Sequence, residues 1–235
     1  MTSGIQDITS SWWEPCDTGQ PVRGQLIRAF VPHVDLMPYR ATPVGRPDPK
    51  VHADAILKIE AQSVSSRPIS SKLPVAALPQ YAGECYTLHR SKCRWCLVIA
   101  TCESEVPREL RPSTTPKWQT APTMLVAPYY GGDQDDARAG WHEPLMERIR
   151  KLEFPQYMLD SLPVPGNKLT RQSILRLDHI MPLGKHHNSY QLGSVRLSEE
   201  ALALLDDWLV WLVTGKLSMN TLLAMAREEL LGLEL

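Results

Sequence analysis

The sequence predicts a mainly β protein whose short strands curl into a small barrel closed by a C-terminal helix. Apolar runs of strand length are separated by irregular loops, and 20 prolines are scattered over the 235 residues. Strands do not alternate regularly with helices, which argues against a parallel α/β sheet. The strongest helical pattern lies near the C-terminus, from Glu199 to Thr214, after the last expected strand. These observations favour a curled antiparallel sheet.

Apolar runs predict the first strands. They cover Gly24–Phe30, Leu97–Ala100 and Thr123–Ala127, and turn or loop signals flank them. Prolines and polar residues dominate Pro32–Pro49, so this segment is expected to be loop. Val51–Glu60 carries Ala, Ile and Leu near helical spacing, which indicates a helical segment.

The C-terminal half has stronger periodicity. Trp141–Leu152 has apolar residues at three- and four-residue spacing, which predicts an amphipathic helix. Ser173–Met181 roughly alternates and is expected to form one half-exposed strand. Ser198 is a typical N-cap for the helix Glu199–Thr214, and Asn220–Leu231 is expected to form a shorter second helix.

Composition restricts the class of protein. The net charge of −1 gives no global attraction to nucleic acid, so an RNA site must be a local basic patch. No apolar run reaches the roughly 18 residues that a membrane span needs. The N-terminus has no signal-peptide pattern, and five cysteines without framework spacing favour a reducing compartment. We therefore expect a cytoplasmic protein with no membrane partner.

Five segments carry a resemblance to a known family. They are Arg23–Ile27, Arg94–Ile99, Met124–Pro128, Ile174–Ile180 and Val195–Glu200, the last leading into the Leu-rich helix. In this order they resemble the strands of the MazF/PemK-type toxins, the endoribonucleases of type II toxin–antitoxin systems. The fourth segment, with Arg, Asp and His before an apolar residue, is the most specific.

The resemblance implies an SH3-like barrel with helical insertions and a C-terminal helix. Residues 1–22 would be an N-terminal arm, 23–215 the barrel with insertions at 31–92 and 131–171, and 216–235 a helical tail. It further implies a homodimer that cleaves single-stranded RNA without metal or cofactor, under the control of an antitoxin protein. Two alternatives stay open: an inactive barrel kept as a binding module, and a nucleic-acid-binding subunit of a larger complex.

Arg176 and Asp178 are the expected catalytic pair. Two residues apart on a strand, they would emerge from one face, as a pair acting on one phosphate requires. A guanidinium can hold two phosphate oxygens, and a carboxylate can accept the proton of the RNA 2′-hydroxyl. Some family members have an Arg and an Asp here as the catalytic pair. A structural ion pair is the alternative.

The resemblance suggests further site residues. His33 follows the first strand, where some relatives carry a functional His, although a plain surface histidine fits as well. Arg94 matches the family's Arg before the second strand, and either an RNA contact or a structural role is open. Lys185 and His186 could bind phosphates or lie in a solvated loop.

Two positions depart from the family pattern. Where the family has Thr or Ser after a conserved Pro, this chain has Tyr129 and Tyr130. A tyrosine can stack on a base or donate its hydroxyl. The change therefore counts against cleavage, because RNA binding survives it more easily than the original phosphate geometry does.

A cysteine-rich segment offers a competing interpretation. Its four soft side chains are Cys85, His89, Cys93 and Cys96, which is enough for one tetrahedral zinc. Genuine sites usually place two ligand pairs on separate elements, and Cys96 begins an apolar strand. Ordinary cysteines are favoured, and no metal site is expected.

Overall fold

The computed structural model describes residues 4–65, 75–79, 83–101, 106–111, 120–132, 140–163 and 172–232. The chain divides into two compact units. One comprises Met1–Phe30 together with Cys93–Leu235, and the other comprises Val31–Lys92. The smaller unit has the bounds of the first expected insertion. That it interrupts a MazF-type barrel stays a prediction.

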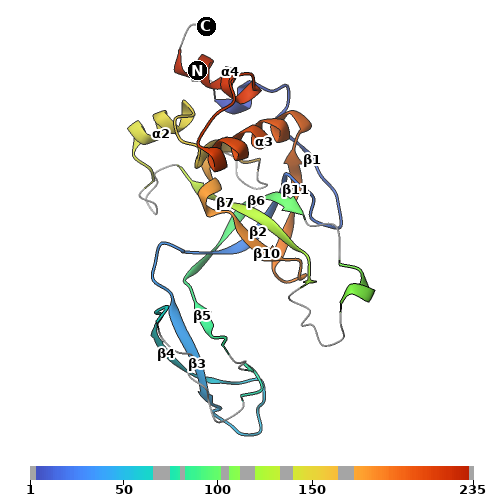
Figure 1. Ribbon diagram of the computed structural model, residues 1–235, viewed down its shortest axis with the longest axis vertical. Helices are drawn as coiled ribbons and strands as arrows, with labels where there is room; N and C mark the ends of the chain where they lie inside the picture. Colours follow the sequence, from blue (N-terminus) through green and yellow to red (C-terminus); the bar gives the residue numbers. More distant parts are fainter. Residues whose placement is uncertain are drawn as a thin grey trace. The chain divides into compact units, whose positions relative to one another are not determined.

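The larger unit contains an eight-stranded sheet (Figure 1). Its strands follow the order β1-β11-β2-β6-β7-β9-β8, and β10 pairs with β7. Their bounds are β1 Trp13–Pro15, β2 Gln25–Pro32, β6 Ser91–Thr101, β7 Thr123–Gly131, β8 Tyr157–Ser161, β9 Gln172–Arg176, β10 Met181–Gly184 and β11 Tyr190–Leu197. The mainly β expectation is confirmed. The closed barrel is not: the described strands follow one open path.

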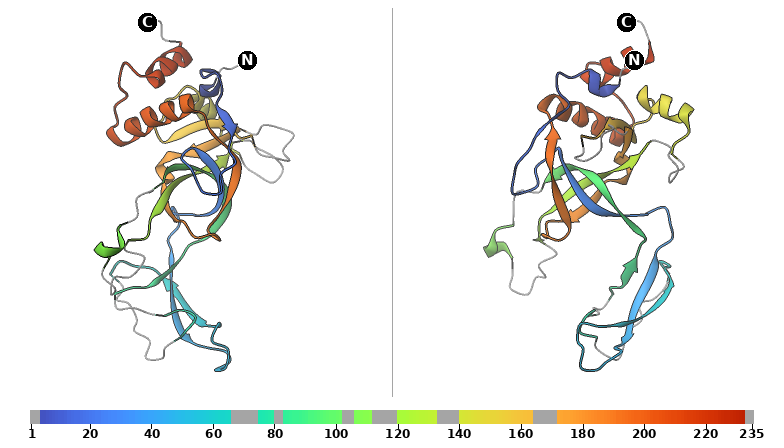
Figure 2. Two further views of the ribbon diagram at one scale, coloured as in Figure 1. Left: turned by 90° about the vertical axis from the view of Figure 1, so that its right-hand side faces the viewer. Right: turned by 180° about the vertical axis from the view of Figure 1, so that it is seen from behind.

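Three helices in the described part accompany this sheet: α2 Glu143–Arg150, α3 Glu199–Thr214 and α4 Leu222–Leu231. The bounds predicted for α3 are confirmed at both ends. The Ser198 hydroxyl accepts a hydrogen bond from the Ala201 amide, and Gly215 ends the helix with a left-handed φ of 68°. In Figure 2, α3 lies beside β11, and α4 packs on α3.

Strands β8 and β9 are covered on both faces. Adjacent residues of a strand point to opposite faces, so Ile174 and Leu175 enter two different apolar clusters. Leu175 joins the main core, to which α3 contributes Trp208. Ile174 joins a smaller cluster with Ile149 of α2. Helix α2 therefore covers one face of these strands, and α3 the other.

The N-terminal segment docks on the sheet. Strand β1 pairs with β11, and Trp12 is buried in the main core. A short 3-10 helix, η1 (Ile5–Asp7), precedes it, and the Gln6 side chain bonds both backbone groups of Ser161 at the end of β8. The expected arm is thus packed against the larger unit.

The smaller unit contains a three-stranded antiparallel sheet of order β4-β3-β5. The strands are β3 Tyr39–Gly45, β4 Ile56–Ala61 and β5 Tyr86–Leu88. Two predictions are wrong here. The proline-bearing segment expected to be loop contains β3, and the segment with helical spacing contains β4. Strand β4 pairs with β3 along its whole length. This pairing outweighs the helical spacing of its apolar residues.

No helix in the described part of the chain is both long enough and apolar enough to cross a membrane.

Candidate functional site

The most specific sequence segment is a strand interrupted by a turn. Strand β9 ends at Arg176, and Leu177–His179 forms a 3-10 helix, η3, before β10 begins. The prediction of one continuous strand over Ser173–Met181 is therefore wrong. Leu177 is buried in the same core as Leu175, and the chain turns immediately after it. This turn, rather than strand alternation, brings Asp178 beside Arg176.

Arg176 and Asp178 form a bidentate ion pair. Arg176 Nε donates to Asp178 Oδ1 at 2.8 Å, and Nη2 donates to Oδ2 at 2.7 Å. The side chains are 17% and 34% exposed. The hydrogen bonds to Asp178 raise the pKa of Arg176 above its ordinary value, against the opposing effect of burial. The guanidinium is thus a fixed, partly desolvated cation.

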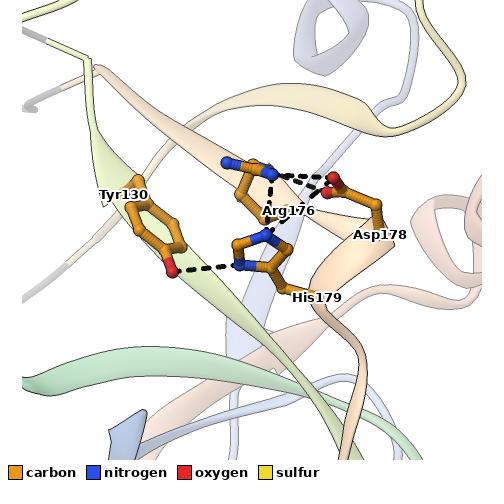
Figure 3. A network of polar contacts seen from close by, with 4 residues as sticks. All are labelled: Tyr130, Arg176, Asp178 and His179. Carbon is orange, nitrogen blue, oxygen red and sulfur yellow. Dashed lines mark hydrogen bonds and ion pairs between the residues drawn. The ribbon is translucent and has the colours of Figure 1, made fainter. Parts of the chain in front are cut away.

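His179 completes the cluster. The sequence did not predict it as a site residue. Its Nε2 lies 2.7 Å from Arg176 Nη2, and its Nδ1 lies 3.1 Å from the Tyr130 hydroxyl (Figure 3). A guanidinium can only donate, so Nε2 must accept and carry no proton. The proton then lies on Nδ1 and is donated to Tyr130. Arg176 and Tyr130 together select one tautomer of His179.

Sheet register explains why these groups meet. Tyr130 of β7 is opposite Ile174 of β9, and Tyr157 of β8 is opposite Arg176. Side chains two residues apart share a face, so Tyr130, Arg176 and Tyr157 lie on the face that α2 partly covers. The Arg176 Cζ lies 5.6 Å from the ring centre of Tyr130 and 5.0 Å from that of Tyr157. The guanidinium is therefore flanked by two aromatic rings.

Arg94 of β6 lies beside this group of side chains. The pairing of Cys96 with Pro128, continued by two residues, sets Arg94 opposite Tyr130. Its Cζ lies 4.0 Å from the Tyr130 ring centre, and its buried Nε has no hydrogen-bond partner. Two guanidinium groups, those of Arg94 and Arg176, thus lie beside the ring of Tyr130.

Other predicted residues lie elsewhere. Tyr129 is buried and its hydroxyl donates to Asp160 at 2.8 Å, so it lies in the core and outside the cluster, and its role as an RNA contact stays a prediction. Lys185 and His186 follow Gly184, which pairs with Thr123 at the opposite end of β7 from Tyr130. At 3.3 Å per residue, these two ends are roughly 20 Å apart along the strand. The structure does not bring Lys185 or His186 into the cluster.

His33 belongs to the smaller unit, where its amide donates to the carbonyl of Arg90. The cluster around Arg176 is assembled entirely within the larger unit and without His33.

The cysteines do not form a metal centre in the described part of the chain. Cys85 and Cys93 are exposed, whereas Cys96 is buried in β6 and burial raises its pKa to about 12. Such a thiol stays protonated and behaves as a small apolar side chain. Among the residues that the structure describes, no three His, Cys, Asp or Glu side chains are placed to hold one ion.

A second polar cluster surrounds Asp160 of β8. Its carboxylate accepts hydrogen bonds from Tyr129, from Trp12 Nε1 at 3.3 Å and from Gln6. Burial raises its pKa to about 6, although these donors favour the charged form. Because its partners tie the N-terminal segment to the sheet, we assign this group a structural role.

Two site residues were missed by sequence reasoning. In the strand expected over Ser173–Met181, His179 would lie on the opposite face from Arg176, three residues away. The Asp178-His179 dipeptide, separated from Arg176 by one residue, was the signal that could have found it. Tyr157 enters through the pairing of β8 with β9, which no local motif reveals.

The cluster combines three chemical capacities in one place. His179 can accept a proton, Arg176 and Arg94 can hold an anion, and Tyr130 offers a ring and a hydroxyl. Comparisons of this chain with protein-family models, with curated proteins and with solved structures found no match. The function is therefore inferred from these residues themselves.

Proposed function

We propose that this protein is an endoribonuclease that cleaves single-stranded RNA without a metal, on a divergent SH3-like barrel of the MazF/PemK type. One observation carries the proposal. An arginine, an aspartate and a histidine converge at the turn after β9, and a second arginine lies across one tyrosine ring. These are the groups that RNA cleavage by its own 2′-hydroxyl needs.

The reaction is an internal displacement at phosphorus. The 2′-hydroxyl loses its proton and its oxygen bonds to the adjacent phosphorus, while the bond from phosphorus to the 5′-oxygen breaks. The products are a 2′,3′-cyclic phosphate and a 5′-hydroxyl, whose proton comes from water. The protein must therefore accept one proton and stabilise the anionic phosphorus centre.

Arg176 is assigned to phosphate binding. Its Nε and Nη2 hold Asp178, and its Nη1 donates to no group among the described residues. Figure 3 shows this nitrogen directed away from Asp178. A phosphate oxygen can therefore bind Nη1 without breaking the ion pair. The raised pKa of Arg176 keeps the charge in place.

His179 is assigned as the general base in place of Asp178. Both carboxylate oxygens of Asp178 already accept hydrogen bonds from the Arg176 guanidinium, so this carboxylate is committed to holding Arg176. His179 Nε2 carries a lone pair in the resting site. When a phosphate at Nη1 shifts the guanidinium within its pair with Asp178, the contact from Nη2 to His179 lengthens and that lone pair becomes available to the 2′-hydroxyl. Asp178 is then a positioning residue for Arg176.

Arg94 and Tyr130 are assigned to RNA binding next to the reacting phosphate. The positive charge of Arg94 suits a second phosphate, and its stacking on Tyr130 fixes the direction of the guanidinium. An antitoxin that controls the activity, a homodimer and a cytoplasmic location belong to the same proposal. Their support is the resemblance of the sequence segments.

One observation favours a second candidate, a binding module without catalysis. The Arg176 guanidinium is neutralised by Asp178 and flanked by two tyrosines, as a structural ion pair would be. In this case the basic patch would bind RNA or a partner protein and leave it intact.

Cleavage of labelled RNA separates the two. Mixed-sequence single-stranded RNA is incubated with the protein in EDTA, and products are examined for 2′,3′-cyclic phosphate ends. We expect Arg176→Ala and His179→Ala to lower the rate by about 100-fold or more. Arg148→Ala is the matched control, because Arg148 also pairs with an acid, Glu153, and stacks on Phe154. RNA that is bound but never cut would instead support the binding module.

A further inference from the structure

Strand β4 leaves an unpaired edge in the smaller unit. The sheet order β4-β3-β5 places β4 at the margin, and no further described strand pairs with it. Its six residues contain no proline and are exposed along almost the whole strand. An open edge of this length presents a row of backbone donors and acceptors to another strand. The other margin, β5, has only three residues and offers a much shorter template.

One face of β4 is apolar and exposed, although Ala41 of β3, opposite Ile59, is buried. Leu57, Ile59 and Ala61 share this face of β4, and Ile59 is 57% exposed. Ala61 is opposite Tyr39 of β3, which is opposite Leu88 of β5, and both Tyr39 and Leu88 are exposed. A strand added to β4 would extend this apolar face.

The charges on β4 favour a second copy of the same strand, in addition to the ion pair that Lys58 and Glu60 form within one copy. Lys58 and Glu60 lie on the opposite face of the strand, with one residue between them. If a second copy of β4 pairs antiparallel about a twofold axis at Ile59, Lys58 faces Glu60 of the other copy twice. Ile59 then faces Ile59 of the other copy, and Leu57 faces Ala61. Opposite charges directly across a sheet stabilise the pair.

Neighbouring registers are worse. Centring the axis on Lys58 sets two lysines face to face, and centring it on Glu60 does the same with two glutamates. A twofold axis midway between two consecutive residues would place Lys58 opposite Ile59, or Glu60 opposite Ile59. Like charges opposite each other destabilise a sheet, so the Ile59-centred register is the favoured one.

We propose that two copies of this chain associate through β4, in antiparallel register about Ile59, to form a continuous six-stranded sheet. The contact is isologous, as expected for a twofold dimer. This inference concerns the smaller unit and does not depend on the proposed ribonuclease activity. It adds a specific strand and register to the general expectation of a homodimer.

The first test measures the mass of the full chain by light scattering and sedimentation over a range of concentrations. We expect a dimer that dissociates on dilution. Ile59→Lys sets two added lysines face to face, and should raise the dissociation constant about tenfold or more. Val213→Lys is the matched control, because Val213 is also apolar, is 83% exposed and lies on α3. Circular dichroism checks that both variants are folded.

The second test checks the register. In a background with Cys85 and Cys93 changed to Ser, Ile59→Cys puts two thiols across the axis, with Cα atoms about 5 Å apart, within disulfide reach. Leu57→Cys is the control, because Leu57 and its copy would be about 13 Å apart in this register. Under mild oxidation, only Ile59→Cys should give a covalent dimer.

Each outcome decides the proposal. A dimer that Ile59→Lys dissociates, and that Ile59→Cys alone cross-links, supports it. A monomer at all concentrations overturns it and leaves β4 to an extended segment of another protein. A dimer unaffected by Ile59→Lys, or cross-linked equally by Leu57→Cys, also overturns it and assigns association to another surface or register.

Discussion

The Nη2 atom of Arg176 lies 2.7 Å from Nε2 of His179, so a permanent cation donates to the ring nitrogen. This contact keeps the proton of His179 on Nδ1, directed to Tyr130. If Nε2 carried a proton, its N–H group would face the N–H group of Arg176 Nη2, and neither could accept. In the proposed reaction, a phosphate that shifts Arg176 would also free His179 Nε2, so we expect phosphate binding and proton transfer to be coupled.

Asp178→Asn tests the division of roles at the turn. The substitution weakens the hold on Arg176 but leaves His179 in place, so we expect cleavage to fall by about tenfold, against about 100-fold or more for His179→Ala. The two variants are compared under single-turnover conditions in EDTA. Equal losses of 100-fold or more would return the base role to Asp178.

Tyr130→Phe isolates the hydroxyl from the ring. The phenyl ring still stacks with Arg94 and Arg176, whereas the acceptor for His179 Nδ1–H is lost. We expect RNA cleavage to fall about tenfold, and the free energy of unfolding to change by no more than about 1 kcal/mol. Urea denaturation measured beside the kinetics separates these effects. A large loss of stability with unchanged cleavage would assign the hydroxyl to folding alone.

Arg94→Ala should weaken RNA binding and reduce its salt dependence. Each phosphate neutralised on a single strand contributes about 0.7 to the slope of log affinity against log salt. We expect the slope to drop by about that amount, as measured by fluorescence anisotropy between low and moderate salt. Arg148→Ala again provides the control and should leave the slope unchanged. An unaltered slope in Arg94→Ala would remove Arg94 from the RNA contact.

Asp160 should make stability depend on pH in an unusual direction. Its pKa is raised to about 6 in the folded protein from an ordinary value of 3.8, so the folded state binds the extra proton. The free energy of unfolding should therefore decrease as pH rises from about 4 to about 6, by up to about 3 kcal/mol from this group.

Subtracting the stability of Asp160→Asn isolates this contribution, because other groups titrate in the same range. The advantage of wild type over Asp160→Asn should shrink as pH rises through that window. The exposed Asp35→Asn variant is the control and should track wild type. A difference that grows with pH would show that the donors around Asp160 outweigh its burial.

Ser198→Ala should destabilise the protein by about 1–2 kcal/mol. Its hydroxyl accepts from Ala201 at the start of α3 and also donates to the carbonyl of Ser11. The loss affects the helix and the docking of the N-terminal segment together. Thr221→Ala removes a similar cap from α4 and should cost less, because its hydroxyl contacts only neighbouring residues of the chain. Thermal and urea unfolding measure both.

Local signals predicted the helices and the buried strands well. Helix α3 combines an N-cap, acids in the first turn, an apolar stripe and a glycine stop, so its bounds could be predicted from the sequence. Strand β4 could not, because its spacing looks helical until β3 is placed beside it. Local periodicity does not show which distant segments of the chain pair with each other.

The same reason limited the prediction of the site. Arg176 and Asp178 were found because they are close in sequence, but the turn that joins them was missed. Arg94 and Tyr130 were each selected, yet their stacking depends on the register of β6 against β7. Tyr129 was predicted to contact RNA together with its neighbour Tyr130. Because side chains alternate along β7, Tyr129 points inward instead, where it bonds Asp160.

The smaller unit begins directly after Phe30 on β2 and ends directly before Cys93 on β6, and these two strands are sheet neighbours. The chain therefore leaves and re-enters the larger unit at adjacent points. An extension attached in this way can be lengthened, shortened or exchanged without altering the strand order that holds Arg94, Tyr130 and Arg176. For engineering, the same junction is a natural place to replace the segment with a tight hairpin or to insert a reporter domain.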